Sequence, residues 1–529
     1  MAARWARREG LQTAGAVRAV PNSRACGVPA ADDAEGRPRR RLVGPGLRAC
    51  AGVDRSCVAL TSSGVSPHSS GGGGVACRHV HIPLSISRRF PLVGGLLSIM
   101  RHAPIDPQVF TSHRDRLRAL LPPHAVVVVH AADTLPTSAD GVRPLHPAPD
   151  LFYLSGIEQE ESVLVLAPDA TEPGHREMLF VRQPSETKAL WDGHSHSREE
   201  ATAISGIEKI RWIDELPAVM HQLMCTSDVV FLNANEHNRA AVEVESRDER
   251  LGRRLMQRYP LHRYERLAPL LHRLRSAKSP VEIELIKRAC AITKDGFERV
   301  ARMLKPGVGE HEVEAEYLHE FTRQKAKMAY SPIVASGGHA CVLHYIDNDG
   351  ECRDGDLLLV DVGASYANYC ADLTRVLPVN GRFSPRQREL YEAVRRVMLS
   401  SIERATVGTL HRDWTRAARD QMTEELLELG LITADDVAKA TEEKPACFKF
   451  FMHGLGHSMG LDVHDVVPRE QRFEPGWVLT VEPGLYLPDE GIGIRLENDI
   501  LVTENGPIDL MADIPLEIDD IEALMASGR

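Results

Sequence analysis

The 529-residue chain has no apolar run that approaches the roughly 18 residues of a membrane-spanning helix. It also has no C-x-x-C pair, because its ten cysteines are scattered along the chain. The first absence argues against a membrane protein. The second indicates reduced thiols rather than a disulfide framework, which in a chain of this length predicts a cytoplasmic protein.

Lysine is missing from residues 1–99, which carry 14 Arg and five acidic residues, a formal charge of +9. The formal total is −11, so the remaining residues carry −20. The net negative charge of residues 100–529 argues against nucleic acid as the main partner, and it suits the binding of hard metal ions.

The same first 99 residues differ from the rest in composition, since they are rich in Arg, Gly, Ser and Pro and have no sustained period. Three interpretations are open: a disordered extension, an organelle transit peptide, or upstream sequence translated from a start codon assigned too early. Ordinary globular sequence follows directly after Met100, which favours the third.

An α/β pattern begins at about residue 107. An amphipathic helix is expected over 109–121. Runs rich in Val, Leu and Phe predict buried strands over 125–131, 162–168, 177–182 and 228–234. We therefore expect an α/β N-terminal domain over residues 100–275.

A second domain is expected over residues 276–529. Its first helix has a cap at Ser279, proline in the first turn at Pro280, and acidic residues that favour the helix dipole. Further helices are expected at about 310–328, 386–406 and 412–430, and strands at about 356–362, 369–378, 477–482 and 491–503. Helices mixed with antiparallel strand pairs predict an α+β class for the two-domain chain.

Four carboxylates follow or interrupt the apolar strands of this second domain. Asp361 ends one run, Asp372 lies eleven residues later, and GASYANY between them suits a hairpin turn. Glu482 ends another run, and strand alternation places Glu497 on the same side as Arg495. Taken singly, these acids could cap loops or form an ion pair. A carboxylate at a buried strand end is otherwise costly unless it is paired or binds a metal.

The segment FMHGLGHSMGLDVHD, residues 451–465, adds three histidines, His453, His457 and His464. The zinc pattern H-E-x-x-H fails, because Gly454 stands where its glutamate would be. The glycines favour a tight turn over a helix. One of these imidazoles together with the four carboxylates would suit two divalent metal ions about 3.5–4 Å apart. Oxygen ligands favour Mn²⁺ or Mg²⁺, and one imidazole also admits Co²⁺, Fe²⁺ or Zn²⁺.

The ordered motifs DLLLVDVG, HGLGH, VEPG and GIGIRLE resemble the dinuclear metallopeptidases of the pita-bread fold (peptidase family M24). The similarity extends from about residue 105 to the C-terminus and includes LFYLSG, RSAKSPVEI and LHYIDND. It is greatest to bacterial-type aminopeptidase P. The resemblance implies a creatinase-like α/β domain followed by a pita-bread domain, and two bound metal ions, with Mn²⁺ expected.

Carried over position by position, the resemblance implies five metal ligands. Asp361 would bind one ion, Asp372 and Glu497 would bridge both, and His457 and Glu482 would complete the second. Glu482 would also act as the general base.

Five residues would face the substrate. His344 and His464 would donate hydrogen bonds to the developing oxyanion. His453, Arg495 and Tyr486 are expected around the proline of the substrate.

The implied activity is release of the N-terminal residue from peptides with proline in second position. The implied partners are peptides with an Xaa-Pro N-terminus and further copies of this chain in a homodimer or homotetramer, with no nucleic acid and no membrane. Two alternatives are open: a prolidase acting on Xaa-Pro dipeptides, and a pita-bread binding protein without catalysis.

Overall fold

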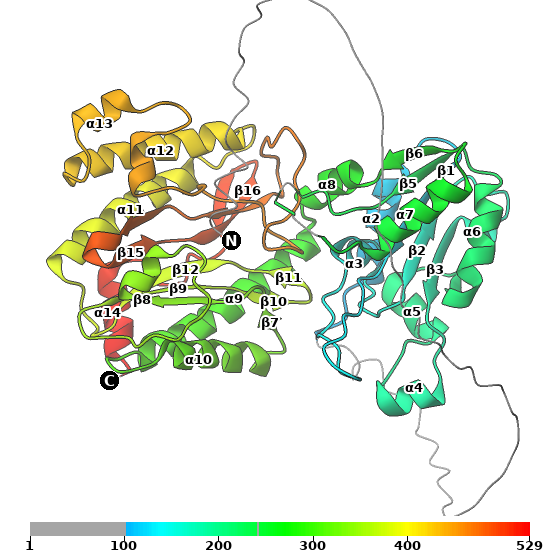
Figure 1. The fold of residues 1–529 in the computed structure, drawn as a ribbon, viewed down its shortest axis with the longest axis horizontal. Helices are drawn as coiled ribbons and strands as arrows, with labels where there is room; N and C mark the ends of the chain where they lie inside the picture. Colours follow the sequence, from blue (N-terminus) through cyan, green and yellow to red (C-terminus); the bar gives the residue numbers. More distant parts are fainter. Residues whose placement is uncertain (1–101, 238, 241–242, 529) are drawn as a thin grey trace, which may run out of the picture. The chain divides into compact units, whose positions relative to one another are not determined.

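The computed structural model describes residues 102–237, 239–240 and 243–528 (Figure 1). All of them fall within one compact unit of the chain. The expectations for residues 1–99, including a start at Met100, lie outside the described residues.

The first part of the described chain is built on a six-stranded mixed sheet in the order β4-β3-β2-β1-β5-β6. Its strands are β1 (Ala125–His130), β2 (Val163–Leu166), β3 (Glu177–Val181), β4 (Ile210–Trp212), β5 (Val229–Leu232) and β6 (Arg263–Arg266). The four strand runs expected from the sequence are β1, β2, β3 and β5.

Helices cover both faces of this sheet. They are α2 (Pro107–Arg118), α3 (Pro149–Ser155), α5 (Arg198–Ser205), α6 (Leu216–Met224), α7 (Arg247–Arg258) and α8 (Ala268–Ser276). Helix α4 (Glu186–Trp191) has no buried residues and covers neither face. Strand β1 is buried on both sides, because its alternate residues enter two different cores. Val126 and Val128 pack with α6 and α7, whereas Val127 and Val129 belong to the core that includes α2, α3, α5 and α8.

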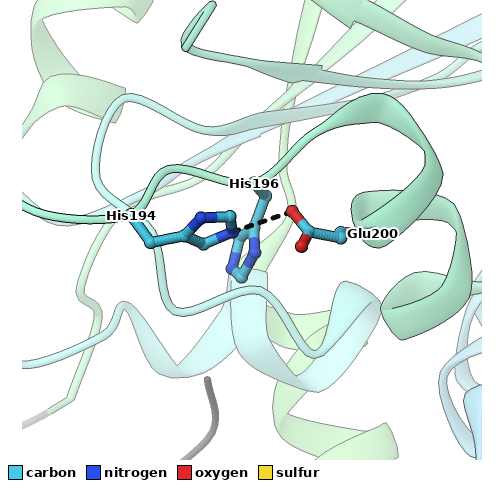
Figure 2. Close-up of side chains that lie close together, drawn as sticks. All are labelled: His194, His196 and Glu200. Carbon is cyan, nitrogen blue, oxygen red and sulfur yellow. Dashed lines mark hydrogen bonds and ion pairs between the residues drawn. The ribbon is translucent and has the colours of Figure 1, made fainter. Parts of the chain in front are cut away.

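Helix α5 begins with a capping box. The Ser197 hydroxyl accepts a hydrogen bond from the Glu200 amide, and Oε2 of Glu200 accepts one from the Ser197 amide at 2.8 Å. The loop before this helix carries His194 and His196, and Figure 2 shows both rings beside the Glu200 carboxylate.

The second part of the described chain contains α9 (Pro280–Met303), α10 (Glu310–Arg323), α11 (Pro385–Glu403), α12 (His411–Glu428), α13 (Ala434–Lys439) and α14 (Ile518–Ala526). The expected cap of α9 is confirmed, because Ser279 and Glu282 form a capping box with proline in the first turn. Helix α10 was expected to reach residue 328, which is wrong. It ends at Arg323, and Lys325 adopts a φ of 64° that turns the chain into a strand.

Antiparallel strands form four small sheets here. They are β7 (Lys327–Met328), β10 (Ala364–Tyr366) and β11 (Tyr369–Cys370); β8 (Ile333–Ser336), β9 (Leu357–Val362) and β12 (Leu373–Pro378); β13 (Val478–Val481), β16 (Asn498–Thr503) and β17 (Gly506–Asp509); and β14 (Gly484–Leu487) with β15 (Ile492–Arg495). Short 3-10 turns cover Pro173–His175, Ile213–Glu215, Gly337–Cys341, Ala446–Lys449 and Pro488–Glu490.

The strands expected at about 369–378 and 491–503 are each divided into two shorter strands at an acidic residue. Asp372 separates β11 from β12, and Glu497 separates β15 from β16. The two members of each pair belong to different sheets, so the chain changes partners at the acidic residue.

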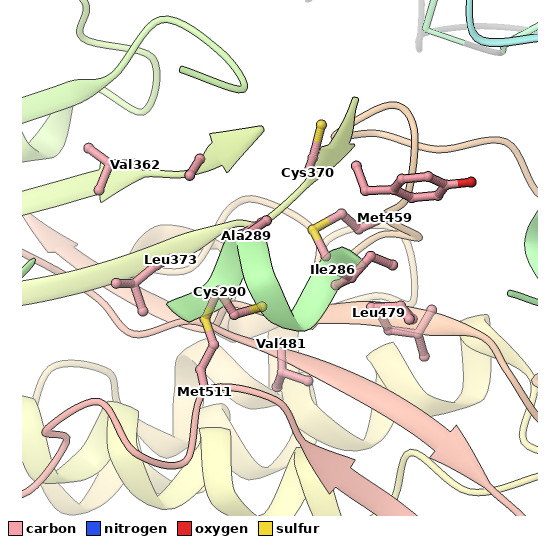
Figure 3. Close-up of a cluster of buried hydrophobic side chains, with 14 of the residues drawn as sticks. Ile286, Ala289, Cys290, Val362, Cys370, Leu373, Met459, Leu479, Val481 and Met511 are labelled. Carbon is pink, nitrogen blue, oxygen red and sulfur yellow. The ribbon is translucent and has the colours of Figure 1, made fainter. Parts of the chain in front are cut away.

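Helix α9 forms the centre of the core below these sheets. Figure 3 shows its Ile286, Ala289 and Cys290 beside Leu373 of β12 and Leu479 of β13. The mixture of helices and antiparallel strands confirms the expected α+β class. None of the described helices combines the length and apolarity needed to cross a membrane. The six described cysteines are free.

Candidate metal centre

Strands β9 and β12 bring the first two carboxylates together, as the sequence predicted. Asp361 lies opposite Thr374, two residues after Asp372, in an antiparallel register. The chain between them forms the β10–β11 hairpin. The Tyr330 hydroxyl lies 2.6 Å from Oδ1 of Asp361 and 2.5 Å from Oδ1 of Asp372. The two carboxylates therefore share one hydrogen-bonding partner.

The glycine-lined segment that carries His457 runs beside β13. The Thr480 amide donates to the His457 carbonyl at 2.9 Å, and the Glu482 amide donates to the Leu455 carbonyl at 2.8 Å. A Cβ on Gly456 would lie 2.0 Å from the Thr480 carbonyl oxygen, so only glycine permits this approach. The expected tight turn is confirmed, and it places His457 and Glu482 on adjacent segments.

The predicted common side of Arg495 and Glu497 is also confirmed. The Thr374 hydroxyl donates to Oε2 of Glu497 at 2.6 Å and accepts from Nε of Arg495 at 3.2 Å. A second nitrogen of Arg495 donates to Oδ2 of Asp361 at 2.5 Å. Glu497 and Asp361 are thus joined through two side chains between them.

The carboxylates converge on one histidine. Ligand atoms of Asp372, His457 and Glu497 all lie within 4.8 Å of one another. Nε2 of His457 is 3.5 Å from Oδ2 of Asp372 and 3.7 Å from Oε1 of Glu482. The structure therefore brings together the five residues for which metal ligation was predicted.

Hydrogen bonds distinguish His457 from His453. Burial lowers the pKa of His457 to about 4, so its ring is neutral at pH 7. Its Nδ1 lies 3.1 Å from the Ser458 carbonyl, which can only accept, so Nδ1 carries the hydrogen and Nε2 keeps a lone pair. That lone pair faces the carboxylates, which is the arrangement of a metal-binding histidine.

Both ring nitrogens of His453 form hydrogen bonds within the protein, so neither is available to a metal ion. Burial lowers its pKa to about 3, so this ring is neutral too. Nδ1 donates to the Gly454 carbonyl at 2.8 Å, and Nε2 accepts from the Tyr486 hydroxyl at 2.8 Å. Arg495 donates to that hydroxyl at 2.9 Å. The three residues expected around the substrate proline therefore form one hydrogen-bonded chain, in which Tyr486 is only 1% exposed.

His464 stacks on His457, with ring centroids 3.9 Å apart and planes inclined by 13°. Burial lowers its pKa to about 2. Its Nδ1 lies 2.6 Å from a guanidinium nitrogen of Arg239. Arginine can only donate, so Nδ1 accepts and the hydrogen of the neutral ring lies on Nε2. His344 is exposed, on the segment that follows β8.

The electrostatics of the centre require positive charge. Burial and the neighbouring carboxylates raise the pKa values of Asp372 and Glu497 well above their usual range. Burial raises the pKa of Glu482 to about 7. Several buried carboxylates in one place are costly to ionise, and cations would offset that cost. Four carboxylates and one imidazole lone pair fit two divalent metal ions.

Four residues around the centre were missed at the sequence level: Tyr330, Thr374, Asp499 and Arg239. Asp499 is fully buried and accepts the Asp372 amide at 3.1 Å. Strand alternation could have indicated Thr374 and Asp499, which lie two residues after Asp372 and Glu497. Tyr330 and Arg239 have no local signal, because their contacts join segments far apart in the chain.

Comparison with known proteins decides the family. The model described as Metallopeptidase family M24 matches residues 284–504, and that of the aminopeptidase P N-terminal domain matches residues 110–231. The chain is 36% identical over 442 residues to the Xaa-Pro aminopeptidase of Escherichia coli K12, covering 80% of this chain and 99% of that protein. The chain belongs to the aminopeptidase P family. The Haemophilus influenzae Xaa-Pro aminopeptidase is 32% identical over 436 residues, covering 80% of this chain and 98% of that protein.

A solved structure of aminopeptidase P agrees with this assignment. It is zinc-substituted E. coli aminopeptidase P in complex with product, with a TM-score of 0.73 and 34% identity, covering 81% of this chain and 100% of that chain. The expected aminopeptidase P N-terminal domain followed by a pita-bread domain is confirmed. So is the predicted enzyme class, a metal-dependent exopeptidase of the Xaa-Pro aminopeptidase type with a dinuclear divalent metal site. These matches do not favour a prolidase.

Proposed function

We propose that this protein uses Mn²⁺ to release the N-terminal residue from peptides that have proline in second position. The observation that carries the proposal is the Nε2 lone pair of His457, which faces Asp372 and Glu482 within a group of buried carboxylates. The named activity of the E. coli relative supports the substrate class.

Asp361, Asp372, His457, Glu482 and Glu497 would hold the two ions. Four of these five ligands are carboxylates, and hard oxygen donors favour Mn²⁺ over softer ions. When bound, such a pair of cations acidifies water and polarises a carbonyl group.

Glu482 is the proposed general base. The oxygen of a water molecule attacks the carbonyl carbon of the first substrate residue, and the Glu482 carboxylate accepts the proton that this water loses. The same carboxyl group then delivers the proton to the proline nitrogen as the carbon–nitrogen bond breaks. Its side chain is 19% exposed, so substrate and water can reach it.

His464 and His344 are the proposed hydrogen-bond donors to the substrate carbonyl oxygen. Nε2–H of His464 is free to donate because Arg239 occupies Nδ1. His344 is exposed, so its ring is accessible to a peptide. Donors fixed before the reaction stabilise charge that develops on the carbonyl oxygen.

His453 is the proposed contact for the proline ring. Tyr486 and Arg495 would not touch the proline but would position His453, because their hydrogen bonds fix the plane of its imidazole. The burial of Tyr486 supports this division, since a fully buried ring has little surface to offer a substrate.

Three wider features belong to the same proposal. We place the domain boundary at residues 275–276, and this position is supported by the gap between the two family matches, which end at residue 231 and begin again at residue 284. Free cysteines support a cytoplasmic protein. A homodimer or homotetramer is supported by Leu190 and Trp191 on α4, which are 82% and 78% exposed.

Hydrolysis of two peptides tests the activity. Protein loaded with Mn²⁺ is given an Xaa-Pro dipeptide and an Xaa-Pro-Yaa-Zaa tetrapeptide, with Glu482→Ala as the blank. The proposal requires cleavage of the tetrapeptide that the variant does not perform. Cleavage of the dipeptide alone would identify a prolidase, and no cleavage of either by metal-loaded protein would contradict catalysis.

A further inference from the structure

A second group of metal-binding side chains lies in the first part of the chain, on and before α5. His194, His196 and Glu200 each place one ligand atom within 4.8 Å of the others. Figure 2 shows the two imidazole rings and the carboxylate turned toward one another. Nε2 of His194 lies 2.8 Å from Oε2 of Glu200. None of these residues belongs to the dinuclear centre.

His196 has an unused nitrogen. Its Nδ1 is buried and has no hydrogen-bond partner among the described residues. Burial also lowers the pKa of this histidine, so its ring is neutral at pH 7 and has a lone pair to offer. Buried polar atoms without a partner are uncommon, and a bound ion is one explanation of such an atom.

The backbone around the three side chains is fixed by neighbouring contacts. The His196 amide donates to Oε1 of Gln159 at 2.7 Å, and Arg182 donates to the Ser195 hydroxyl at 3.1 Å. Glu200 is fixed by its place in the capping box of α5. The loop is therefore held before any ligand arrives, which lowers the entropic cost of binding.

We propose that His194, His196 and Glu200 bind a Zn²⁺ ion separate from the dinuclear centre. Two imidazoles and one carboxylate form a ligand set typical of zinc, whereas Mn²⁺ and Mg²⁺ prefer sites dominated by oxygen. The ion would replace the hydrogen between His194 and Glu200, and that hydrogen would move to Nδ1 of His194. A fourth position stays open to water, since His194 is 45% exposed.

The geometry allows this with small side-chain movements. Zinc ligands lie about 2.0–2.2 Å from the ion, so tetrahedral neighbours are separated by roughly 3.3 Å. The present separation of 2.8 Å between His194 and Glu200 must open slightly, and the outermost pair must close from at most 4.8 Å. The carboxylate can keep its bond to the Ser197 amide, because it has lone pairs on both oxygens.

Glu200→Gln is the decisive variant. An amide oxygen still accepts from the Ser197 amide, so the capping box and the fold are kept, while the negative ligand is lost. His194→Ala/His196→Ala removes both imidazoles. His311→Ala, which removes an exposed histidine of α10, is the matched control.

The test is the number of Zn²⁺ ions bound per chain. Chelator-treated full-length proteins are dialysed against micromolar Zn²⁺ and analysed by inductively coupled plasma mass spectrometry. Wild type and His311→Ala should each carry one more Zn²⁺ than Glu200→Gln and the double-histidine variant. Zn²⁺ should also raise the thermal midpoint of wild type more than that of Glu200→Gln. Equal zinc counts in wild type and Glu200→Gln, when circular dichroism shows both folded, would overturn the proposal.

Discussion

The hydroxyl of Thr374 donates a hydrogen bond to Oε2 of Glu497 at 2.6 Å. Thr374 lies on β12 and Glu497 lies at the break between β15 and β16, so this bond joins two sheets at the metal centre. A hydrogen bond of this kind orients a carboxylate before it binds a metal.

We therefore expect Thr374→Val to weaken Mn²⁺ binding about 10- to 100-fold, because Glu497 loses its donor while a β-branched side chain still suits the strand. Equilibrium dialysis against Mn²⁺ gives the dissociation constant. Thr374→Ser keeps the hydroxyl and should bind like wild type. An unchanged dissociation constant in Thr374→Val would show that the bond has no role in binding metal.

Arg239 determines which nitrogen of His464 carries the hydrogen. Losing one donor to an oxyanion costs roughly 10²–10³ in kcat. Arg239→Met leaves the His464 ring in place but no longer fixes its hydrogen on Nε2. We therefore expect a smaller fall in kcat, about tenfold, with KM nearly unchanged. Steady-state kinetics on the tetrapeptide measure this, and Arg239→Lys, which keeps a donor, should recover most of the rate. A wild-type kcat in Arg239→Met would refute the tautomer argument.

Arg275 on α8 is 4% exposed and forms ion pairs with three carboxylates, those of Asp150, Asp462 and Asp465. Removing one partner from such a buried network costs about 3–5 kcal/mol, because charges are left uncompensated. Arg275→Met should lower the free energy of unfolding in urea by this amount. Arg273→Met, an exposed arginine of the same helix, should change it by less than about 0.5 kcal/mol. Equal effects of the two substitutions would contradict the network.

The pKa of Asp465 predicts how the stability of the folded protein changes at acidic pH. Burial opposes its ionisation, but Arg275 at 2.6 Å and Lys278 at 3.2 Å hold its pKa below the ordinary 3.8. A lowered folded-state pKa stabilises the protein fully above the unfolded value, and this stabilisation is lost as the pH falls through the folded value.

Asp465→Asn measures that contribution. The difference in unfolding free energy between wild type and this variant should stay constant from pH 7 to about pH 4 and shrink below it. Urea titrations at a series of pH values give the difference. A difference that grows as the pH falls from 7 to 5 would mean that the folded-state pKa is raised instead.

The residues proposed as ligands could be picked out in the sequence because they lie at the end of an apolar run, within a strand or in a glycine-rich turn. Asp361 and Glu482 follow runs of buried residues, where a carboxylate needs a partner. The role of His457 came from family resemblance, and the hydrogen bonds of its ring supply the physical reason. Sequence periodicity could not reveal this, since the acceptor is the carbonyl of Ser458.

The residues that the sequence missed act across long distances in the chain. Tyr330 bonds to Asp372, 42 positions away, and Arg239 bonds to His464, 225 positions away. The breaks in the expected strands at Asp372 and Glu497 were also missed. An apolar pattern predicts that a segment is extended, but it does not say which sheet each half of the segment joins.

One measurement tests the central claim, that a dinuclear centre held by these residues performs peptide hydrolysis. Chelator-treated protein is titrated with Mn²⁺, and bound metal and tetrapeptide hydrolysis are measured on the same samples. Wild type should bind two Mn²⁺ ions per chain at full activity. Asp372→Asn, with the same shape and no charge, should bind fewer and hydrolyse nothing. Two bound ions and wild-type hydrolysis in Asp372→Asn would contradict the account.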